Sequence, residues 1–280
     1  MPPNQTQTQT QTQDHDQQTQ PKITLYRGFP TPRTYTWSPF VTKLEARLRF
    51  ARIPYVTESG SVRAAPRGKI PYLSIQPASG ERRTMADSTL ITQSFIAAGV
   101  FTDLNAGLGG REKVLDRGVR VVLEERGYFL QSYEKWIDNY YAMRDHILSS
   151  IPYPIRVMVG YLIYRKQIQM LHGQGTARYT AAERRGFKRE IWEEINALLV
   201  EARAKRGGEG EDEDDGPFWV LGGEGPSEAD ATLFGFVVGA LICTACPESQ
   251  GIVRGFPVVV EYARRIHERF FPEYEVWGDF

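Results

Sequence analysis

The spacing of apolar residues predicts alternating strands and helices in the first third of the chain. Residues 23–29 alternate between apolar and polar side chains, as a strand does. Ser38-Pro39 then opens a segment whose apolar residues recur at steps of three and four, which predicts an amphipathic helix that ends at Ile53-Pro54. Three short strand patterns follow, at residues 55–57, 72–75 and 82–85. A further helix is expected from Ser88 to about Ala98.

This order, strand-helix-strand and then strand-strand-helix, is typical of a thioredoxin-like domain, in which helices pack on a small mixed sheet. From Arg111 onward strand patterns disappear, and helical stripes cover the rest of the chain, at residues 111–145, 155–171, 180–206, 229–241 and 258–271. The predicted fold class is therefore α/β plus all-α. We expect a thioredoxin-like domain at 22–101, a linker at 102–110 and an all-helical domain at 111–280.

Two low-complexity segments flank these patterns. Residues 1–21 are rich in Gln and Thr and offer almost no apolar surface to offset the entropy of ordering, so we expect a disordered tail. Residues 207–216 carry six acidic side chains among glycines, which predicts a flexible loop at the surface.

The charge is balanced overall but uneven along the chain. Lys and Arg number 34, and Asp and Glu also number 34. Residues 22–101 hold 12 basic and 4 acidic side chains, a net +8, whereas residues 207–216 carry −6. The zero total gives no support for a nucleic-acid partner, and the basic first domain predicts steering of a small anion.

Apolar stretches, targeting patterns and the number of cysteines indicate the class of protein and its cellular location. The longest apolar stretch, 231–246, is shorter than the ~20 residues of a membrane-spanning helix, so no span is expected. The N-terminus matches neither a signal peptide nor a matrix-targeting sequence. The chain has only 2 Cys, so we expect no disulfide framework. We expect a cytoplasmic protein. The four isolated histidines lack the spacing of a metal site, so no metal is expected.

The first candidate motif is Ile70-Pro71, which opens the strand at 72–75. A cis peptide bond here would expose the backbone N–H and C=O of Ile70 for pairing with an extended peptide ligand. An ordinary trans proline at the start of a strand fits the spacing equally well.

The second motif, Asp87-Ser88, lies directly before a predicted helix. A hydroxyl, free N–H groups and a carboxylate at this point can hold the head group of a free amino acid. Asp and Ser are also common N-caps, and this simpler reading is open as well.

Ser38 is the third candidate, at the turn between the first strand and the first helix. Its hydroxyl can donate a hydrogen bond to a ligand thiolate, while Ser followed by Pro is also a preferred helix start. Because the two cysteines are Cys243 and Cys246, no protein thiol is available at this turn, and any thiol must come with the ligand.

Cys243 and Cys246 have the C-x-x-C spacing of redox sites. They follow an apolar helix, however, where the negative end of the helix dipole opposes a thiolate, and two cysteines do not complete a zinc site. We therefore expect no function for this pair.

Taken in order, Ser38-Pro39-Phe40, Lys69-Ile70-Pro71, Ala86-Asp87-Ser88 and a helical half with Ser227-x-x-Asp230 resemble the glutathione S-transferase superfamily. The resemblance covers about residues 22–275. It implies a cis proline whose preceding backbone binds the cysteinyl part of glutathione, an acidic residue and Ser88 on the γ-glutamyl group, and Ser38 as thiol activator. Ser227-x-x-Asp230 matches a capping box, which serves folding.

The closer resemblance is to the failed axon connections and metaxin-like branch. It rests on these segments: residues 38–45, 123–125, 133–136, 171–178 and 262–272. This branch includes interaction and import components, so the resemblance leaves two functions open.

The first function is an enzyme that joins glutathione, as co-substrate, to a small hydrophobic electrophile. Arg67 and Lys69 are then expected on the glycyl carboxylate, and these aromatic residues on the electrophile pocket: Tyr35, Trp37, Tyr133, Trp136 and Tyr140. Helical core packing explains the last three equally well. The second function is a non-catalytic binding or scaffold protein with the same fold, and the sequence also leaves a homodimer open.

Overall fold

The computed structural model describes residues 21–77, 80–206 and 216–278. The predicted tail at 1–21 and the predicted acidic loop at 207–216 lie, apart from Pro21 and Gly216, outside the described residues. The chain divides into two compact units. Unit 1 consists of Met1–Pro32 with Ala51–Phe101, and unit 2 consists of Arg33–Phe50 with Thr102–Phe280.

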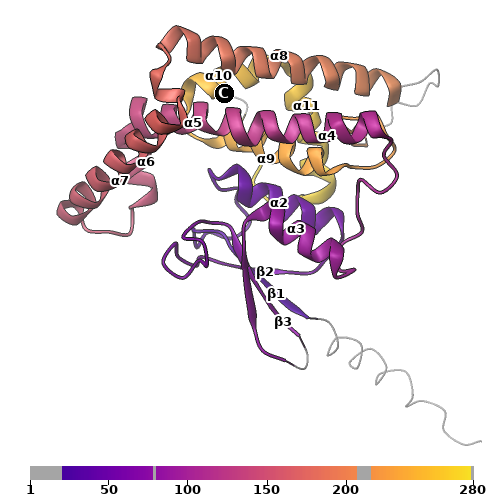
Figure 1. The fold of residues 1–280 in the computed structure, drawn as a ribbon, viewed down its shortest axis with the longest axis horizontal. Coiled ribbons are helices and arrows are strands. Elements are labelled where there is room, and N and C mark those ends of the chain that lie inside the picture. The colour runs from indigo at the N-terminus through magenta and orange to yellow at the C-terminus, as the bar shows by residue number, and fades with distance from the viewer. Residues whose placement is uncertain (1–20, 78–79, 207–215, 279–280) are drawn as a thin grey trace, which may run out of the picture. The chain divides into compact units, whose positions relative to one another are not determined.

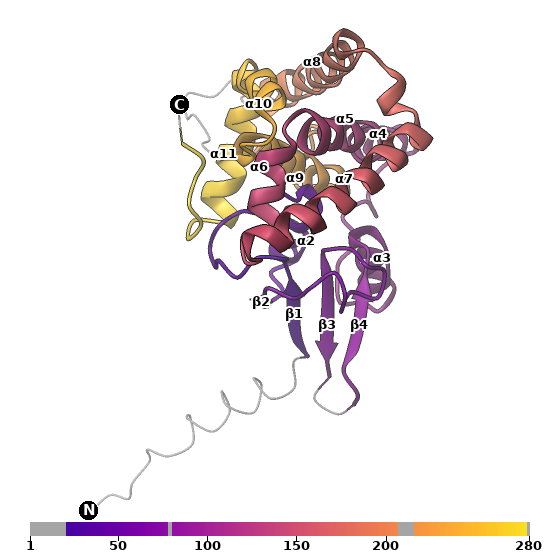
Figure 2. The same ribbon diagram turned by 90° about the vertical axis from the view of Figure 1, so that its left-hand side faces the viewer.

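Unit 1 is built on one mixed sheet, whose strands are β1 (Lys22–Tyr26), β2 (Val56–Glu58), β3 (Tyr72–Gln76) and β4 (Arg83–Ala86). Their order in the sheet is β2-β1-β3-β4. β1 pairs in parallel with β2 and antiparallel with β3, which in turn pairs antiparallel with β4. Figure 2 shows β1, β3 and β4 side by side. β1 has neighbours on both edges, and its residues from Ile23 to Tyr26 are all buried.

Helix α3 (Ser88–Ala97) follows β4 and completes unit 1 (Figure 1). Its buried residues Ile91 and Phe95 are four positions apart, as expected for one face of a helix. A second cluster in this unit contains Tyr26 and Tyr72, whose rings stack with centroids 4.3 Å apart. The cluster ties the central strands β1 and β3 together next to Ile70.

Unit 2 is helical. Its elements are α2 (Pro39–Phe50), α4 (Gly110–Val121), η1 (Val122–Gly127), α5 (Tyr128–Tyr133), η2 (Glu134–Asp138), α6 (Tyr140–Ile147), α7 (Tyr153–Gln174), η3 (Thr176–Arg178), α8 (Ala181–Arg206), α9 (Glu228–Ile242), α10 (Pro247–Arg254) and α11 (Pro257–Phe270). The four-stranded thioredoxin-like sheet and the helical region that follows it confirm the predicted fold class.

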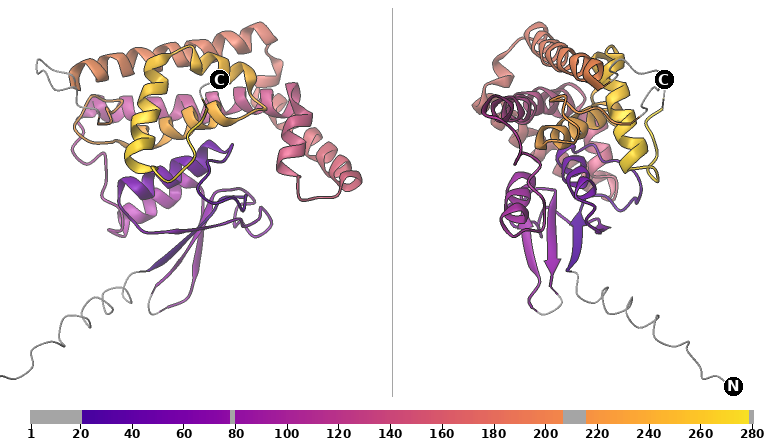
Figure 3. Two further views of the ribbon diagram at one scale, coloured as in Figure 1. Left: turned by 180° about the vertical axis from the view of Figure 1, so that it is seen from behind. Right: turned by 90° about the vertical axis from the view of Figure 1, so that its right-hand side faces the viewer.

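Helix α9 is the central helix of unit 2. All its residues from Glu228 to Leu241 are buried, which suits a helix that is apolar on every side. It packs on α2, α4, α10 and α11, and Figure 3 shows it enclosed by other helices in both views. The predicted capping box is present, because the N–H and hydroxyl of Ser227 both donate to Asp230, each at 2.8 Å.

Two features of unit 2 differ from the sequence-based expectation. The helix predicted over 111–145 contains two π-helical turns, η1 and η2, and is interrupted at Asn139 (φ −121°, ψ 39°). Helix α10 is not among the predicted helices, since the sequence patterns place none between residues 241 and 258. Pro247 opens α10, a position that proline favours because a helix leaves its first N–H groups unpaired.

Among the described residues, no single helix has the length and apolarity to span a membrane. The pair α9 and α10, bent by 117°, meets those criteria of length and composition only when the two are taken together.

Candidate functional site

Sheet register brings two of the predicted motifs to one end of unit 1. In the antiparallel pair of β3 and β4, Tyr72 lies opposite Ala86. Ile70-Pro71 leads into Tyr72, and Asp87-Ser88 follows Ala86, so both motifs lie beyond the same end of this strand pair. The Ile70–Pro71 peptide bond is cis, the first of the two alternatives that the sequence left open.

Asp87 holds an unusual backbone conformation at this end. Its φ of 77° and ψ of 114° lie outside the regions that non-glycine residues ordinarily occupy, at a cost of about 1–3 kcal/mol. Its side chain accepts hydrogen bonds from the N–H groups of Thr89 (3.0 Å) and Leu90 (3.1 Å), so it caps α3. Both bonds go to Oδ1, and the side chain is exposed, which leaves Oδ2 accessible to a cation.

Ser88 is the first residue of α3, and 5% of its surface is exposed. Its carbonyl accepts a hydrogen bond from the Thr92 hydroxyl at 2.9 Å. Its own hydroxyl makes no hydrogen bond to the described part of the chain. N–H groups of a helix's first turn lack partners within the helix, so Ser88 combines a hydroxyl donor with the positive end of α3. These are the elements of a carboxylate site.

The loop before β3 supplies positive charge to unit 1. Arg67 and Lys69 are both exposed and flank Gly68, whose φ of 62° turns the chain between them. Neither side chain forms an ion pair within the described ranges 21–77, 80–206 and 216–278. Both are therefore able to pair with an anion from solvent.

Ser38 lies in unit 2, directly before α2. Its carbonyl accepts hydrogen bonds from the N–H groups of Val41 (3.2 Å) and Thr42 (3.4 Å), which starts the helix as the Ser-Pro pattern predicts. The hydroxyl is half-buried and makes no hydrogen bond with any described residue. It is therefore free to donate to an outside acceptor at the positive end of α2.

The two aromatic residues before Ser38 contact protein groups of unit 2. Tyr35 is buried in the core of the unit, and its hydroxyl is 2.8 Å from Nδ1 of His267. The Trp37 ring stacks on His146 with centroids 3.5 Å apart, and its carbonyl accepts a hydrogen bond from Nζ of Lys135 at 3.0 Å. The pocket role predicted for Tyr35 has no support here, because its ring and hydroxyl are both occupied by core contacts.

The other three aromatic candidates also contact protein groups. Trp136 is buried, the Arg184 guanidinium lies 3.7 Å from the centroid of the Tyr133 ring, and the Tyr140 and Tyr164 rings are 5.2 Å apart. These contacts favour the core-packing alternative over an open pocket. A small pocket of unit 2 lies elsewhere, lined by Leu123, Gly127, Gln131, Lys188, Ile191, Trp192, Phe236 and Ser249.

Sequence reasoning missed the surroundings of Cys243 and Cys246, both of which are buried. Burial alone would lower the pKa of Lys135, but the nearby Cys246, Cys243, Tyr128 and Glu134 together raise it above the usual lysine value. A buried ammonium therefore lies close to the two thiols. No pattern in the sequence connects Lys135 with the cysteines, because more than a hundred residues separate them. In the described part of the chain, no group of three or more His, Cys, Asp or Glu is arranged to hold a metal ion.

Comparison with known proteins agrees with this architecture. Residues 39–143 match the family described as the glutathione S-transferase N-terminal domain. A glutathione S-transferase from Rhodospirillum rubrum F11 has a TM-score of 0.51 at 14% identity, with 90% of each chain covered. FzlA from C. crescentus has a TM-score of 0.52 at 15% identity, over 92% of this chain and 94% of that one.

Glutathione transferase GSTFuA3 from Phanerochaete chrysosporium has a TM-score of 0.51 at 14% identity, over 92% of this chain and 98% of that one. At these identities the solved structures establish a shared fold. The fold is that of the glutathione S-transferases, and the match to residues 39–143 supports the superfamily resemblance seen in the sequence.

Proposed function

We propose that this chain is a glutathione transferase-like enzyme that joins glutathione to a small apolar electrophile. The observation that carries the proposal is the register of β3 and β4, which places Ile70-Pro71 and Asp87-Ser88 beyond the same end of one strand pair. The chemistry found there suits an extended peptide that carries a free amino-acid head group. The match to the glutathione S-transferase N-terminal domain supports the choice of ligand.

Each part of glutathione has a proposed partner in unit 1. The backbone of Ile70 pairs with the cysteinyl backbone, in the manner of an added strand. The hydroxyl and N–H of Ser88, at the positive end of α3, hold the γ-glutamyl carboxylate, while Oδ2 of Asp87 holds its ammonium. Arg67 and Lys69 bind the glycyl carboxylate.

Ser38 is the proposed catalytic residue. Its hydroxyl makes no hydrogen bond within the described residues and lies at the positive end of α2, so both features favour an anion. A hydrogen bond from Ser38 to the glutathione sulfur stabilises the thiolate relative to the thiol, which increases the nucleophile concentration at neutral pH. The thiolate then attacks an electrophilic carbon, forming a C–S bond and releasing the leaving group.

Turnover of an aryl halide with glutathione tests the role of Ser38. Loss of one hydrogen bond to a developing or stable anion costs about 10²-fold in kcat, so Ser38→Ala is expected to lose about that factor. Glutathione affinity should change little, because unit 1 supplies the proposed binding contacts. Ser38→Thr keeps the hydroxyl and serves as the matched variant, expected to retain most of the activity. Equal kcat values for the wild type and Ser38→Ala would exclude Ser38 as activator.

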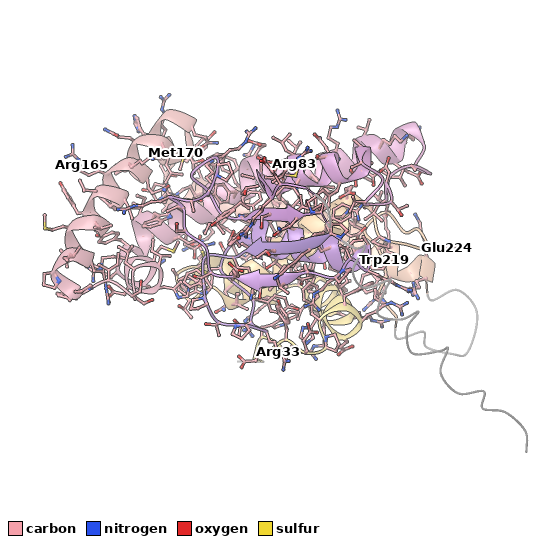
Figure 4. The ribbon with its side chains drawn as sticks, turned by 90° about the horizontal axis from the view of Figure 1, so that it is seen from below. Arg33, Arg83, Arg165, Met170, Trp219 and Glu224 are labelled. Atoms are coloured by element: carbon pink, nitrogen blue, oxygen red, sulfur yellow. The ribbon has the colours of Figure 1, made fainter. Side chains whose placement is uncertain are left out.

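A non-catalytic binding or scaffold protein of the failed axon connections or metaxin type is the second candidate. The observation that favours it is one face of α7, where Ile155, Met158 and Leu162, spaced by three and four residues, are 53%, 71% and 65% exposed. Figure 4 shows this helix with Arg165 and Met170 along it. Exposed apolar side chains in a row are a feature of binding surfaces. Glutathione binding without turnover of any electrophile would favour this candidate, as would a protein partner that binds the wild type but not Met158→Asp.

A further inference from the structure

Cys243 and Cys246 occupy a tight turn between two helices. α9 ends at Ile242, Cys243 follows it, and Cys246 is the N-cap of α10. The N–H of Cys246 donates to the carbonyl of Cys243 at 2.9 Å, which closes a four-residue turn. Such a turn keeps its terminal Cα atoms within about 7 Å, close to the separation of about 4.4–6.8 Å that a disulfide spans. The backbone therefore already holds the two cysteines within bonding range.

The thiols of this turn interact directly. The Cys246 thiol donates to the carbonyl of Gln131 at 3.8 Å. Its proximity is the largest influence on Cys243 and lowers the pKa of Cys243 to about 7; Lys135 and the Ala245 N–H act in the same direction. Burial raises the pKa of Cys246 well above its usual value. Cys243 therefore loses its proton at lower pH than Cys246 and is the thiol that becomes a thiolate first.

Two structural features oppose the sequence-based argument against a thiolate at this turn. We placed the pair at the negative end of an apolar helix, where a thiolate is disfavoured. The turn also precedes the positive end of α10, and the buried ammonium of Lys135 lies beside it. The carboxylate of Glu134 opposes both effects on Cys243, but it is engaged by Lys188 at 2.8 Å and by the Ser249 hydroxyl at 2.6 Å.

We propose that Cys243 and Cys246 are a redox-active dithiol that hydrogen peroxide converts to an intramolecular disulfide, with Lys135 as the positioning residue that favours the thiolate. The Cys243 thiolate attacks one peroxide oxygen, the O–O bond breaks, and hydroxide leaves. Cys243 is then a sulfenic acid. The Cys246 sulfur attacks the sulfenic sulfur, the S–S bond forms, the S–O bond breaks, and the leaving hydroxide takes the Cys246 proton as water. Two sulfurs are oxidised, and the peroxide is reduced to water.

The packing around the turn selects a small oxidant. Both cysteines are fully buried, and the half-buried side chains of Trp37 and Met143 pack against them. A protein disulfide cannot approach such a sulfur without local opening, whereas hydrogen peroxide is close in size to water. A peroxide is therefore the class of oxidant that fits this site.

Mass spectrometry of the reduced full chain treated with hydrogen peroxide tests the disulfide. The chain contains only these 2 Cys, so the assignment is unambiguous. We expect the loss of two hydrogen atoms, a peptide pair linked through Cys243 and Cys246, and no alkylation after denaturation. In Cys246→Ser, we expect a sulfenic acid at Cys243 that dimedone captures. In Cys243→Ser, the remaining thiol should oxidise about tenfold more slowly, because little of it is thiolate.

Three results would overturn the proposal: two thiols still free after treatment, a sulfinic acid in place of the disulfide, or disulfide-linked dimers as the main product. Faster oxidation of Cys243→Ser than of Cys246→Ser would overturn the assignment of Cys243 as the attacking group.

The pH dependence of the oxidation rate tests Lys135. The titratable groups around the pair come from several elements: Lys135 and Glu134 of η2, Tyr128 of α5 and His146 of α6. The wild-type rate should be half-maximal near pH 7, the pKa of Cys243. Lys135→Met should shift this midpoint upward and slow oxidation at pH 7 about tenfold, and Lys135→Arg should restore it. The same midpoint in all three proteins would exclude the role of Lys135, and the Arg variant keeps the test valid if the Met variant does not fold.

Discussion

At the scale of single residues, Asp230 is a fully buried carboxylate that accepts four hydrogen bonds from groups of unit 2. It accepts from the N–H groups of Val220 and Ser227 (2.8 Å each), the Ser227 hydroxyl (2.8 Å) and the Tyr262 hydroxyl (3.0 Å). Burial raises its pKa from 3.8 to about 6, against the effect of these hydrogen bonds. The spacing of Ser227 and Asp230 was readable in the sequence. The bonds to Val220 and Tyr262 were not, because they depend on the tertiary fold.

Asp230→Ala should destabilise the protein by about 3–5 kcal/mol, because it leaves several buried donors without an acceptor. Glu183→Ala is the matched control. Glu183 closes a capping box on Thr180 with the same spacing, but it is exposed, so its loss should destabilise the protein much less. Urea denaturation of the two variants and the wild type measures both values. Equal losses of stability in the two variants would show that burial does not determine how much a capping box contributes to the free energy of unfolding.

The raised pKa of Asp230 also fixes the sign of a pH effect. Since the folded value of about 6 exceeds the unfolded value of about 4, the native state binds the proton more tightly. The contribution of this carboxyl to the free energy of unfolding therefore falls as the pH rises from about 4 to about 6. It is constant above that range, and the effect should be absent from the pH profile of Asp230→Ala.

At the scale of helices, the approach of α9 to α2 depends on one glycine. A Cβ atom at Gly235 would lie 2.4 Å from the Pro39 carbonyl oxygen and 2.9 Å from the Lys43 nitrogen, both backbone atoms. Neither atom moves without displacing the helix. Gly235 therefore fixes the start of α2, the helix that presents Ser38 at its N-terminus.

Gly235→Ala should destabilise the protein by about 3 kcal/mol or more, because the added methyl group overlaps backbone. Gly118→Ala, in α4, is the matched control: a Cβ there meets nothing within 4 Å, and alanine should stabilise the helix by up to about 1 kcal/mol. Thermal or urea unfolding distinguishes the expected loss of stability in Gly235→Ala from the expected gain in Gly118→Ala. A stable Gly235→Ala protein would contradict the close approach of α9 and α2.

The helices and strands differ in how well the sequence predicts them. The six predicted elements from the first strand to α3 are all present, because their periodicity and turn residues are local signals. The π-helical turns η1 and η2 have no such signal, since they arise where packing shifts the hydrogen bonds of a continuous helix. Helix α10 did have a signal in the sequence, Pro247 at its first position, which the periodicity of apolar residues does not detect.

At the scale of the whole molecule, the balanced charge of the sequence separates into a basic and an acidic part. The +8 of residues 22–101 belongs mostly to unit 1, which holds the proposed partners of a dianionic peptide. The sequence supplied every residue of that proposed site, but not their arrangement. Ile70 and Ser88 come together only through the register of β3 and β4, which no local pattern encodes. For the aromatic residues that we expected in an electrophile pocket, the sequence leaves their role open, because helical spacing does not distinguish a pocket from a core.

The most direct test of the account is a calorimetric titration of glutathione into the wild type, Ser88→Ala and Ser94→Ala. Ser94 is exposed on the same helix, α3, and serves as the matched control. We expect the wild type and Ser94→Ala to bind glutathione equally, and more weakly as the salt concentration rises. Ser88→Ala should bind about tenfold more weakly, the value of one hydrogen bond to a charged group. Absence of glutathione binding by the wild type, or equal affinity in Ser88→Ala, would contradict the account.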